Sequence, residues 1–291
     1  MSMLIATVVL VVGLERSPRW RVRPLPFLRP YFTTDVAYLL TGWIGTAALS
    51  LAWVTAGQGM LARLGVPRLA VSTLPSWLAV VLAVVALDAG NYVAHWLLHR
   101  VDVLWEVHKV HHSSPRLDWL ATFRSHIVEQ VLRRFVAPVL LIVAGVPVDI
   151  VAMAASIFVA WAMLNHANVH LRLGPLEAIL ITPRLHRLHH TPATTERNLG
   201  TILTLWDRLR GTLVTGNAEP RVFGLPGESE PYPEGWWRQL VEPGRRVARQ
   251  AASAALAPRW RRYISAAQRK PGRDASCARQ LATRDGIDGI G

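Results

Sequence analysis

Residues 76–98 read SWLAVVLAVVALDAGNYVAHWLL, and residues 35–57 read DVAYLLTGWIGTAALSLAWVTAG. Each run is apolar over the roughly 20 residues that a helix needs to cross the hydrocarbon core of a bilayer. The later run carries His95 near its end, and His99 stands just beyond it. We predict a membrane-spanning helix at each run, with histidines where the second helix leaves the membrane.

The composition agrees with a membrane protein, because hydrophobic residues make up 51% of the 291 residues. A third apolar stretch covers residues 135–164, and Gly145-Val146-Pro147 divides it with a turn signal. Histidine-rich segments flank this stretch, and they can share a metal only on one side of the membrane, so we expect a re-entrant or tilted hairpin. The predicted fold is all-α: an integral membrane helical bundle of about four spanning or re-entrant helices, capped by a cytosol-facing, histidine-rich helical domain.

The formal net charge is +13, and arginine supplies nearly all of it because lysine occurs only at Lys109 and Lys270. Such an excess fits nucleic acid or an anionic membrane surface. The arginines flank apolar runs, and no basic helix interleaved with aromatic residues occurs outside the tail, so we expect lipid headgroups and no nucleic acid. Positive charge marks the cytoplasmic side, which predicts a multi-pass protein with its active site and C-terminus in the cytoplasm. The cations that set this orientation are Arg16, Arg19, Arg21, Arg23, Arg29, Arg100, Lys109, Arg116 and Arg124.

The two ends of the chain differ in character. Residues 1–14 are apolar but lack the basic leader and cleavage site of a signal peptide, which predicts a short anchor or an interfacial helix. We divide the chain into an anchor with a basic juxtamembrane segment (1–34), a membrane domain that holds the histidines (35–240) and a basic, largely disordered tail (241–291). Trp236-Trp237 fits an interfacial anchor near the end of the membrane domain.

All eleven histidines fall between positions 95 and 190. His95 and His99 are four residues apart, which puts them on one face of a helix with Cβ atoms about 6 Å apart. The triplet H-x-x-H-H occurs at 108–112 and again at 186–190, and because its members share a helical face the two triplets resemble two half-sites. A further i, i+4 pair follows the third apolar stretch. The predicted metal ligands are His95, His99, His108, His111, His112, His166, His170, His186, His189 and His190.

Two interpretations without metal can be weighed against this one. Buried, unpaired imidazoles cost about 1 to 3 kcal/mol each, so ten would cost about 10 to 30 kcal/mol against a total stability of about 5 to 15 kcal/mol. Solvated surface histidines would not produce H-x-x-H-H twice. Metal binding is therefore the interpretation we adopt. His126 belongs to no pair, and both a hydrogen-bonding role and no role are open for it.

The ligand set bounds the kind of metal site. Cys277 is the only cysteine, so neither a disulfide nor a thiolate site can form. Imidazole suits zinc, copper and iron, so ligand type does not name the metal. A closed structural zinc takes four ligands, whereas eight to ten histidines predict two metal ions with positions left open for oxygen or water.

Two polar residues share a helical stripe with the first histidine pair. Asp88, Tyr92, His95 and His99 stand at i, i+4, i+7 and i+11. A carboxylate inside a membrane-spanning helix costs a few kcal/mol and is functional by default. We expect Asp88 and Tyr92 to orient ligand imidazoles through hydrogen bonds or to line the substrate route; a helix-packing contact is the alternative. For Asp207 we expect an ion pair with a nearby arginine.

Further motifs accompany the histidines in a fixed order. They are Asp88 and Tyr92 ahead of His95-x-x-x-His99, Trp105 before HKVHHSS, FRSH at 123–126, NHANVH at 165–170, TPRLHRLHHT at 182–191 and NLGTILTLWDRLRGT at 198–212. Together they resemble the membrane-bound fatty acid hydroxylase and sterol desaturase superfamily, from about residue 80 to about residue 240.

The resemblance implies a helical membrane enzyme with a cytosol-facing di-iron site that uses dioxygen to hydroxylate or desaturate the alkyl chain of a lipid, whether fatty acyl, sterol-like or ether lipid. It also implies that the eight motif histidines bind metal and, in the fatty acid hydroxylase branch, that His166 and His170 do so. No flavin or nicotinamide motif is visible, so electrons must come from an external cytochrome, ferredoxin or pterin.

Two other functions remain open at the level of sequence. A zinc-dependent membrane lipid hydrolase would turn over without oxygen, and the bound metal would distinguish it. A membrane metal transporter would carry its ligands near the bilayer midplane, whereas these histidines cluster beyond the ends of the apolar runs.

Overall fold

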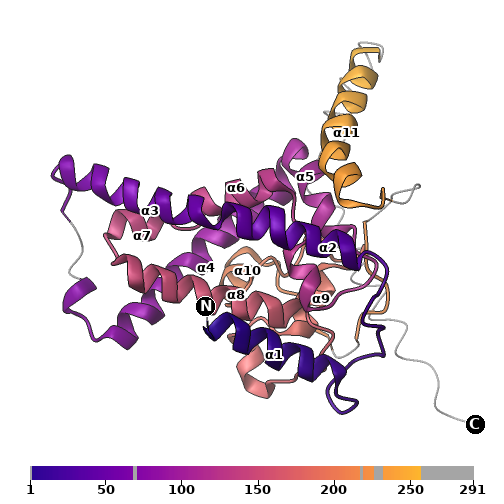
Figure 1. The fold of residues 1–291 in the computed structure, drawn as a ribbon, viewed down its shortest axis with the longest axis horizontal. Helices are drawn as coiled ribbons and strands as arrows, with labels where there is room; N and C mark the ends of the chain where they lie inside the picture. Colours follow the sequence, from indigo (N-terminus) through magenta and orange to yellow (C-terminus); the bar gives the residue numbers. More distant parts are fainter. Residues whose placement is uncertain (1, 68–70, 217–218, 226–231, 257–291) are drawn as a thin grey trace, which may run out of the picture. The chain divides into compact units, whose positions relative to one another are not determined.

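The computed structural model describes residues 2–67, 71–216, 219–225 and 232–256, and within these ranges the chain is helical, with two isolated antiparallel bridges and no strand (Figure 1). The helices are α1 (Ser2–Arg16), α2 (Phe32–Tyr38), α3 (Gly45–Arg63), α4 (Ser76–Arg100), α5 (Asp102–His112), α6 (Ile127–Val136), α7 (Val139–Ala144), α8 (Val148–His166), α9 (Pro183–His189), α10 (Leu205–Arg210) and α11 (Trp236–Leu256), with a π-helical segment η1 (Leu39–Ile44) and short 3-10 helices η2 (Val71–Thr73), η3 (Trp119–Phe123) and η4 (Gly174–Ala178).

Within the described residues, three stretches are long and apolar enough to cross a membrane: Phe32–Arg63, in which η1 joins α2 to α3 without a break, then α4, and then α8. The helices predicted at 35–57 and 76–98 fall inside the first two and are confirmed. Leu51, Leu82 and Met153 on these stretches are exposed, as expected of side chains that face lipid. The predicted all-α membrane bundle is therefore confirmed.

The third apolar stretch folds as a hairpin with a broken outgoing arm. The chain leaves through α6 and α7, which are separated at Ala137-Pro138 because proline cannot continue a helix, and it returns through α8. Gly145 ends α7 with a φ of 66°. The amide of Val146 donates to the carbonyl of Leu141 at 3.0 Å, which closes the helix end in the way glycine permits. The turn predicted at residues 145–147 is confirmed.

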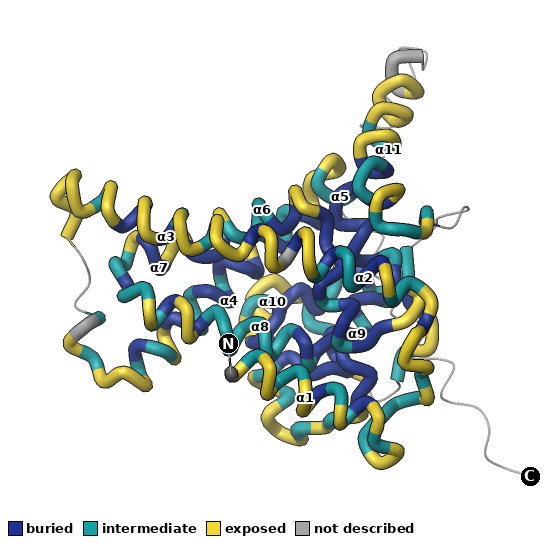
Figure 2. The backbone as a smooth tube through the Cα atoms, in the orientation of Figure 1, coloured by how far each residue is buried: buried dark blue, intermediate teal, exposed yellow. Residues whose placement is uncertain are grey.

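Helix α4 lies against most of the other elements, since it packs on α5, α6, α7 and α8. In the membrane part its Leu87 joins Val54 of α3, Leu141 of α7 and Val151 of α8 in one apolar core. Beyond the end of α4 the packed side chains are largely polar. Almost every residue of α9 in this part is buried, whereas α3 in the membrane part is exposed along much of its length (Figure 2). The histidines belong to this polar part.

Contacts near the amino end hold the polar part together. The 15-residue helix α1 packs on α8 and η3. After it, Arg29 pairs with Asp118 and with Asp35 at 2.5 and 2.7 Å, and Arg124 pairs with Asp35 at 2.5 Å, with the arginine side chains fully buried. A buried charge left without a partner would be strongly destabilising, so these pairs fix the segment that follows α1 against η3.

At the carboxyl end, contacts divide the chain into two compact units, Met1–Arg245 and Arg246–Gly291, and the site lies in the first. The boundary predicted at residue 240 falls inside helix α11. Trp237 on this helix is exposed. The disorder predicted for the last twenty or so residues lies outside the described residues.

Candidate metal centre

Nine of the ten predicted ligands gather in two neighbouring groups, and all nine are buried. Within each group the candidate ligand atoms lie within 4.8 Å of one another. The rings of His112 and His190 stack with their centroids 4.6 Å apart and connect the groups. Group A is His95, His99, His108, His112 and His189; group B is His111, His166, His186 and His190.

Helical register decides which histidine joins which group. Each i, i+4 pair stays together: His95 with His99 and His108 with His112 in group A, and His186 with His190 in group B. The middle residue of each triplet, His111 or His189, joins the other group. In a helix the side chains at positions i+3 and i+4 point about 100° apart, so these two members of a triplet face different ways. The prediction that each triplet forms one half-site is therefore wrong: both triplets contribute to both groups.

The orientation of four rings shows where their protons lie. A carbonyl oxygen can only accept a hydrogen bond, so the Nδ1 that faces it carries the proton and Nε2 of the neutral ring presents a lone pair. Nε2 of His111 lies 3.2 Å from Nε2 of His166, so in group B two lone pairs face each other. Two such lone pairs cannot hydrogen-bond to each other, and a cation between them would stabilise the arrangement. The four contacts are His95 to Leu199 O (2.8 Å), His111 to Arg124 O, His166 to Ala162 O and His189 to Arg197 O (2.9 Å each).

Protonation of one of these two rings is disfavoured, so a proton does not supply that cation near pH 7. Burial, followed by the neighbouring His166, lowers the pKa of His111 to about 3. Burial, followed by the adjacent imidazoles, also lowers the pKa values of other histidines in both groups well below the usual range. These rings are therefore neutral near pH 7, and the neutral imidazole is the form that binds metal. The pKa values lowered in this way are those of His108, His112, His186, His189 and His190.

The spacing of the ring nitrogens fits metal coordination. Nitrogens that share one ion at about 2.1 Å must lie about 3.0 Å apart in an octahedron and about 3.4 Å apart in a tetrahedron. In the described chain neither nitrogen of the buried His112 has a hydrogen-bond partner, an arrangement that a bound ion would stabilise. These are two buried histidine clusters able to bind metal. The Nε2 separations His95–His99, His95–His108, His111–His166, His166–His186 and His186–His190 are all 3.2 Å.

His170 lies apart from both groups, so its assignment as a ligand is corrected. Helix α8 ends at His166, and the next residues are extended and bridge to Arg21, so the predicted i, i+4 relation does not exist. The His170 side chain is exposed, and its Nε2 faces Arg172 at 3.4 Å. His126 makes hydrogen bonds: it caps α6 at Val128 N and contacts Leu240 O at 3.0 Å.

Among the described residues, neither Asp88 nor Tyr92 makes a hydrogen bond to an imidazole. The Asp88 carboxylate accepts from the amides of Ile202 and Leu203, both at 3.0 Å, and from Trp206 Nε1 at 2.8 Å. Asp88 thus forms the packing contact that was the alternative, and not the expected hydrogen bond to an imidazole. The expectation that Asp88 and Tyr92 line the substrate route stays a prediction. Tyr92 packs against Trp206, with ring centroids 6.5 Å apart.

Asp88 nevertheless helps to hold the site from behind, together with Asp207. Instead of the predicted arginine, Asp207 binds the amides of Leu199 and Gly200 at 3.0 and 2.7 Å and the Thr212 hydroxyl at 2.6 Å. The two carboxylates thereby fix the segment whose Leu199 carbonyl orients His95. They are positioning residues that act through the backbone.

A polar relay beside the site was not predicted. Glu129 of α6 is 1% exposed, and its Oε2 lies 3.0 Å from Nδ1 of His108, although the ring N–H does not point at the oxygen. Its Oε1 accepts from Arg133, which donates to Asn91, which donates to Thr201 at 3.0 Å. Asn91 could have been found, because it stands four residues before His95. No sequence signal places Glu129 near His108.

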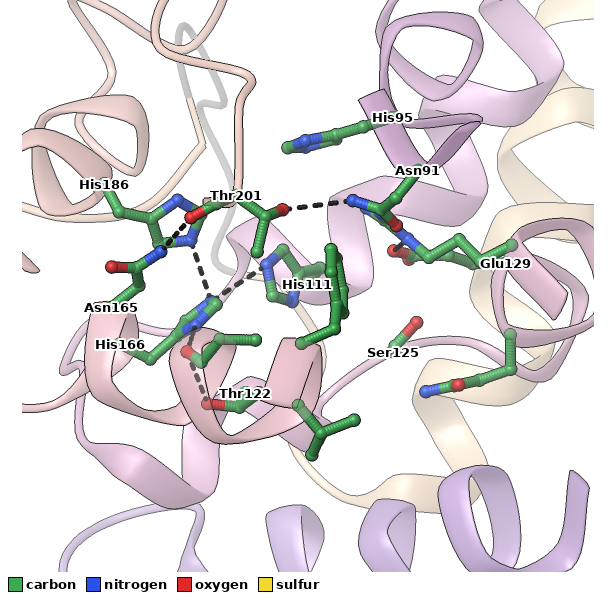
Figure 3. A pocket seen from close by; sticks show the side chains of 15 residues that line it. Asn91, His95, His111, Thr122, Ser125, Glu129, Asn165, His166, His186 and Thr201 are labelled. Carbon is green, nitrogen blue, oxygen red and sulfur yellow. Dashed lines mark hydrogen bonds and ion pairs between the residues drawn. The ribbon is translucent and has the colours of Figure 1, made fainter. Parts of the chain in front are cut away.

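A cavity of about 120 Å³ opens beside the histidines. Three of the four group B rings line it, together with His95 of group A. Figure 3 shows His166 and His186 on one side of this cavity and Ser125 and Glu129 on the other. We call it the metal-site pocket. The pocket therefore leaves space beside group B for a few non-hydrogen atoms.

Comparison with known proteins finds a family model and several relatives that are similar to this chain. Residues 80–212 match the family model for fatty acid hydroxylase. The ornithine lipid hydroxylase OlsE of Rhizobium tropici is 33% identical over 217 residues, which are 68% of this chain and 64% of the relative. The alkylglycerol monooxygenases of Danio rerio and Homo sapiens are 32% and 31% identical, over 50% and 49% of this chain and 32% of each relative.

The chain thus spans less than two thirds of the first relative's length and about a third of the others'. No solved structure matches it. The family match covers residues 80–212. This segment includes both histidine groups, Glu129 and the metal-site pocket. Residues 80–212 are therefore similar to the fatty acid hydroxylase family over the segment that holds the candidate metal centre.

Proposed function

We propose that the protein is a membrane-bound, dioxygen-dependent oxidoreductase that hydroxylates or desaturates the alkyl chain of a lipid, with one iron ion in group A and another in group B. The observation that carries this proposal is the facing pair of Nε2 lone pairs of His111 and His166, which a metal ion would satisfy, whereas the lowered pKa of His111 disfavours a shared proton near pH 7. The names of the relatives, a lipid hydroxylase and monooxygenases, support the lipid substrate.

The chain's own residues would prepare the site for the metal. Burial keeps the imidazoles neutral, and backbone carbonyls fix four of the rings. Bound iron would supply the activation of dioxygen. Forming one hydroxyl group breaks a C–H bond and forms a C–O bond, and it consumes one dioxygen, two electrons and two protons, with the second oxygen atom leaving as water. An external cytochrome, ferredoxin or pterin would supply the electrons.

The site would face the cytoplasm. The ligands lie at and beyond the ends of α4 and α8 that carry His99 and His166, and Arg100 and Lys109 follow the end of α4. Cations flanking a span favour the cytoplasmic side. Ligands at the ends of the spans also differ from those of a transporter, which lie near the bilayer midplane.

The test compares lipids from three strains that express the wild type, His111→Ala or His170→Ala. His111 belongs to group B, and His170 is the matched control because it is exposed and outside both groups. We expect wild type and His170→Ala to convert a lipid to a product with one added oxygen atom or two fewer hydrogen atoms, and His111→Ala to convert none. Purified wild type should contain iron and consume oxygen.

Two outcomes would contradict the proposal. Zinc in the purified protein, with turnover that does not need oxygen, would indicate a membrane lipid hydrolase instead. Identical lipids in the wild-type and His111→Ala strains would exclude oxidation of a lipid by this site.

A further inference from the structure

Four large apolar side chains between α8 and residue 212 are exposed, although they lie outside the stretches able to cross a membrane. Leu176 and Ile179 stand in η4 and just after it, and Leu205 and Leu209 are on α10. We call these four residues the apolar patch. Leu209 is 73% exposed, and the other three are about half exposed. Single exposed leucines are ordinary, whereas a contiguous apolar group is typical of a surface that binds a partner or a membrane.

Backbone contacts join the two halves of the apolar patch. An antiparallel bridge connects the segment after η4 to the segment before α10. Next to this bridge, the amide of Thr204 donates to the carbonyl of Ile179 at 2.9 Å, and the Thr204 hydroxyl donates to the carbonyl of Ala178 at 2.7 Å. Leu205 follows directly, and Leu209 stands four residues later on the same face of α10. The four side chains therefore form one fixed surface.

Contacts to α4 and α8 put this surface beside the membrane-crossing stretches and not beyond their ends. On α10, Trp206 Nε1 donates to the Asp88 carboxylate at 2.8 Å. Asp88 stands 11 residues before His99, so it lies about 17 Å from that end of α4. In the last turns of α8, Trp161 Nε1 donates to the carbonyl of Ile181 at 2.9 Å. A surface at this level would meet the bilayer, where a water-soluble partner could not reach it.

The direction of α10 orders its side chains by depth. The guanidinium of Arg210 stacks over the Trp96 ring, 4.7 Å from its centroid. Trp96 is about 12 Å nearer than Asp88 to the His99 end of α4, so α10 begins deep along α4 and ends near the level where α4 would leave the membrane. Apolar side chains at the deep end and arginines at the shallow end are the arrangement of a helix in a membrane interface.

The charges favour an anionic leaflet over a second copy of the chain. Arg208 and Arg210 are exposed, and Arg208 Nε donates to the carbonyl of Ala178, next to the apolar patch, at 3.1 Å. In residues 171–212, all of which the structure describes, the one exposed carboxylate is Glu196, and it faces His99 at 3.5 Å. Two copies of this face would bring like charges together, which is unfavourable. Lipid phosphates would instead pair with the arginines.

We propose that η4 and α10 form an interfacial membrane element: the apolar patch enters the acyl region of the leaflet on the histidine side, and Arg208 and Arg210 bind the phosphates of anionic phospholipids. This inference goes beyond the proposed function, because it needs neither metal nor turnover. The same segment of chain carries the Leu199 carbonyl that orients His95, so the membrane would hold one wall of the candidate metal centre.

The depth of the patch can be measured with a nitroxide label on the full-length protein in phospholipid vesicles. Leu209→Cys is labelled in a Cys277→Ala background, because Cys277 is the only cysteine of the chain. We expect oxygen, which dissolves in the acyl region, to relax this nitroxide more than a water-soluble nickel chelate does. Met153→Cys, 52% exposed on the membrane-crossing α8, is the lipid-facing control. Ala193→Cys, exposed after α9, is the aqueous control.

Two results of this measurement would overturn the proposal. Stronger relaxation of the nitroxide at position 209 by the nickel chelate would place the patch in water. Low accessibility to both reagents would show that protein covers the patch, as in an oligomer.

Headgroup selectivity tests the two arginines. A fluorophore on Leu209→Cys is quenched by brominated lipid beside it, and brominated phosphatidylglycerol is compared with brominated phosphatidylcholine at equal mole fraction. One arginine at an anionic surface strengthens association on the order of fivefold, so we expect phosphatidylglycerol to associate at least on the order of fivefold more tightly. Equal quenching by the two lipids would contradict binding of anionic headgroups.

Three variants assign this preference to the charges of α10. Arg208→Gln combined with Arg210→Gln should abolish it, whereas Arg208→Lys combined with Arg210→Lys keeps both charges and should retain it. The lysine pair thus separates lost charge from lost structure. Arg116→Gln removes an exposed arginine outside the patch and should leave the preference unchanged. Loss of the preference in the lysine pair or in Arg116→Gln would overturn the proposal.

Discussion

Glu129 puts a buried carboxylate behind one ligand of group A, 3.0 Å from Nδ1 of His108. A negative charge behind a ligand imidazole strengthens the ligand and restrains its ring. Glu129→Gln removes the charge and keeps the shape of the side chain. We expect it to weaken metal binding by roughly 10- to 100-fold, measured as iron retained after dialysis against a chelator.

The matched control is Glu196→Gln. Glu196 lies 3.5 Å from Nδ1 of His99, also in group A, but its side chain is 57% exposed. Solvent screens an exposed charge, so its removal should change iron retention little. Equal losses of iron in the two variants would show that the burial of Glu129 has no special effect on the site.

Glu15 gives the protein a stability that depends on pH. Burial, reinforced by Asp118, raises the pKa of Glu15 to about 7, while its Oε1 accepts from the amides of Trp119 and Asn168 at 2.9 Å. Because the folded pKa is higher than the unfolded one, the contribution is fully present below the unfolded pKa of 4.5. It falls by about 3 kcal/mol as the pH rises through the folded pKa.

Glu15→Gln tests this, because glutamine keeps the acceptor oxygen and cannot ionise. Thermal unfolding in detergent should show the wild type losing stability between about pH 5 and about pH 8, and the variant losing less. Parallel curves for the two proteins would rule out Glu15 as the titrating group.

Between elements, α4 approaches the residue after α6 closely at Gly90. A Cβ added at Gly90 would meet the backbone of Ala137, including its carbonyl oxygen, and backbone cannot rotate away as a side chain can. Gly90→Ala should therefore push α6 from α4 and cost about 1 to 3 kcal/mol, measured by thermal unfolding. Gly59→Ala on α3 is the control, since nothing lies within 4 Å of its added Cβ. A similar loss of stability in both variants would contradict the close contact.

The elements also show what sequence can predict. Apolar runs identified the spans, and Gly145-Val146-Pro147 identified the turn before α8, because these signals are local. The histidine spacings identified nine members of the site. They failed at His170 because the end of α8 depends on how the next residues pack. The histidine spacings could not assign the ligands to two groups, because that assignment depends on how α5 packs against the neighbouring helices. Glu129 was not predicted as part of the site, because its partner, His108, lies on another helix.

Across the whole molecule, the candidate metal centre joins segments that are distant in sequence. Its ligands come from α4, α5, the end of α8 and the segment around α9. In the membrane part, apolar side chains pack these helices together. In the polar part the nine imidazoles occupy positions where apolar side chains would otherwise pack, and their neutral rings face one another with few hydrogen bonds. The metal would therefore contribute to stability as well as to chemistry.

Removal of metal should consequently loosen one part of the molecule and spare another. A ligand that binds only the folded state stabilises it by about 4 kcal/mol at 1,000 times its dissociation constant. Chelation should lower the unfolding temperature in detergent and increase amide hydrogen exchange in α9 and in residues 198–203, which adjoin the groups through the Leu199 carbonyl. Exchange in α3, which contributes no ligand, is the internal reference. His170→Ala should respond to chelation as the wild type does, whereas His111→Ala should show fast exchange in α9 before any chelator is added. Protection in α9 that is the same with and without metal would mean that the imidazole clusters are held by the protein alone.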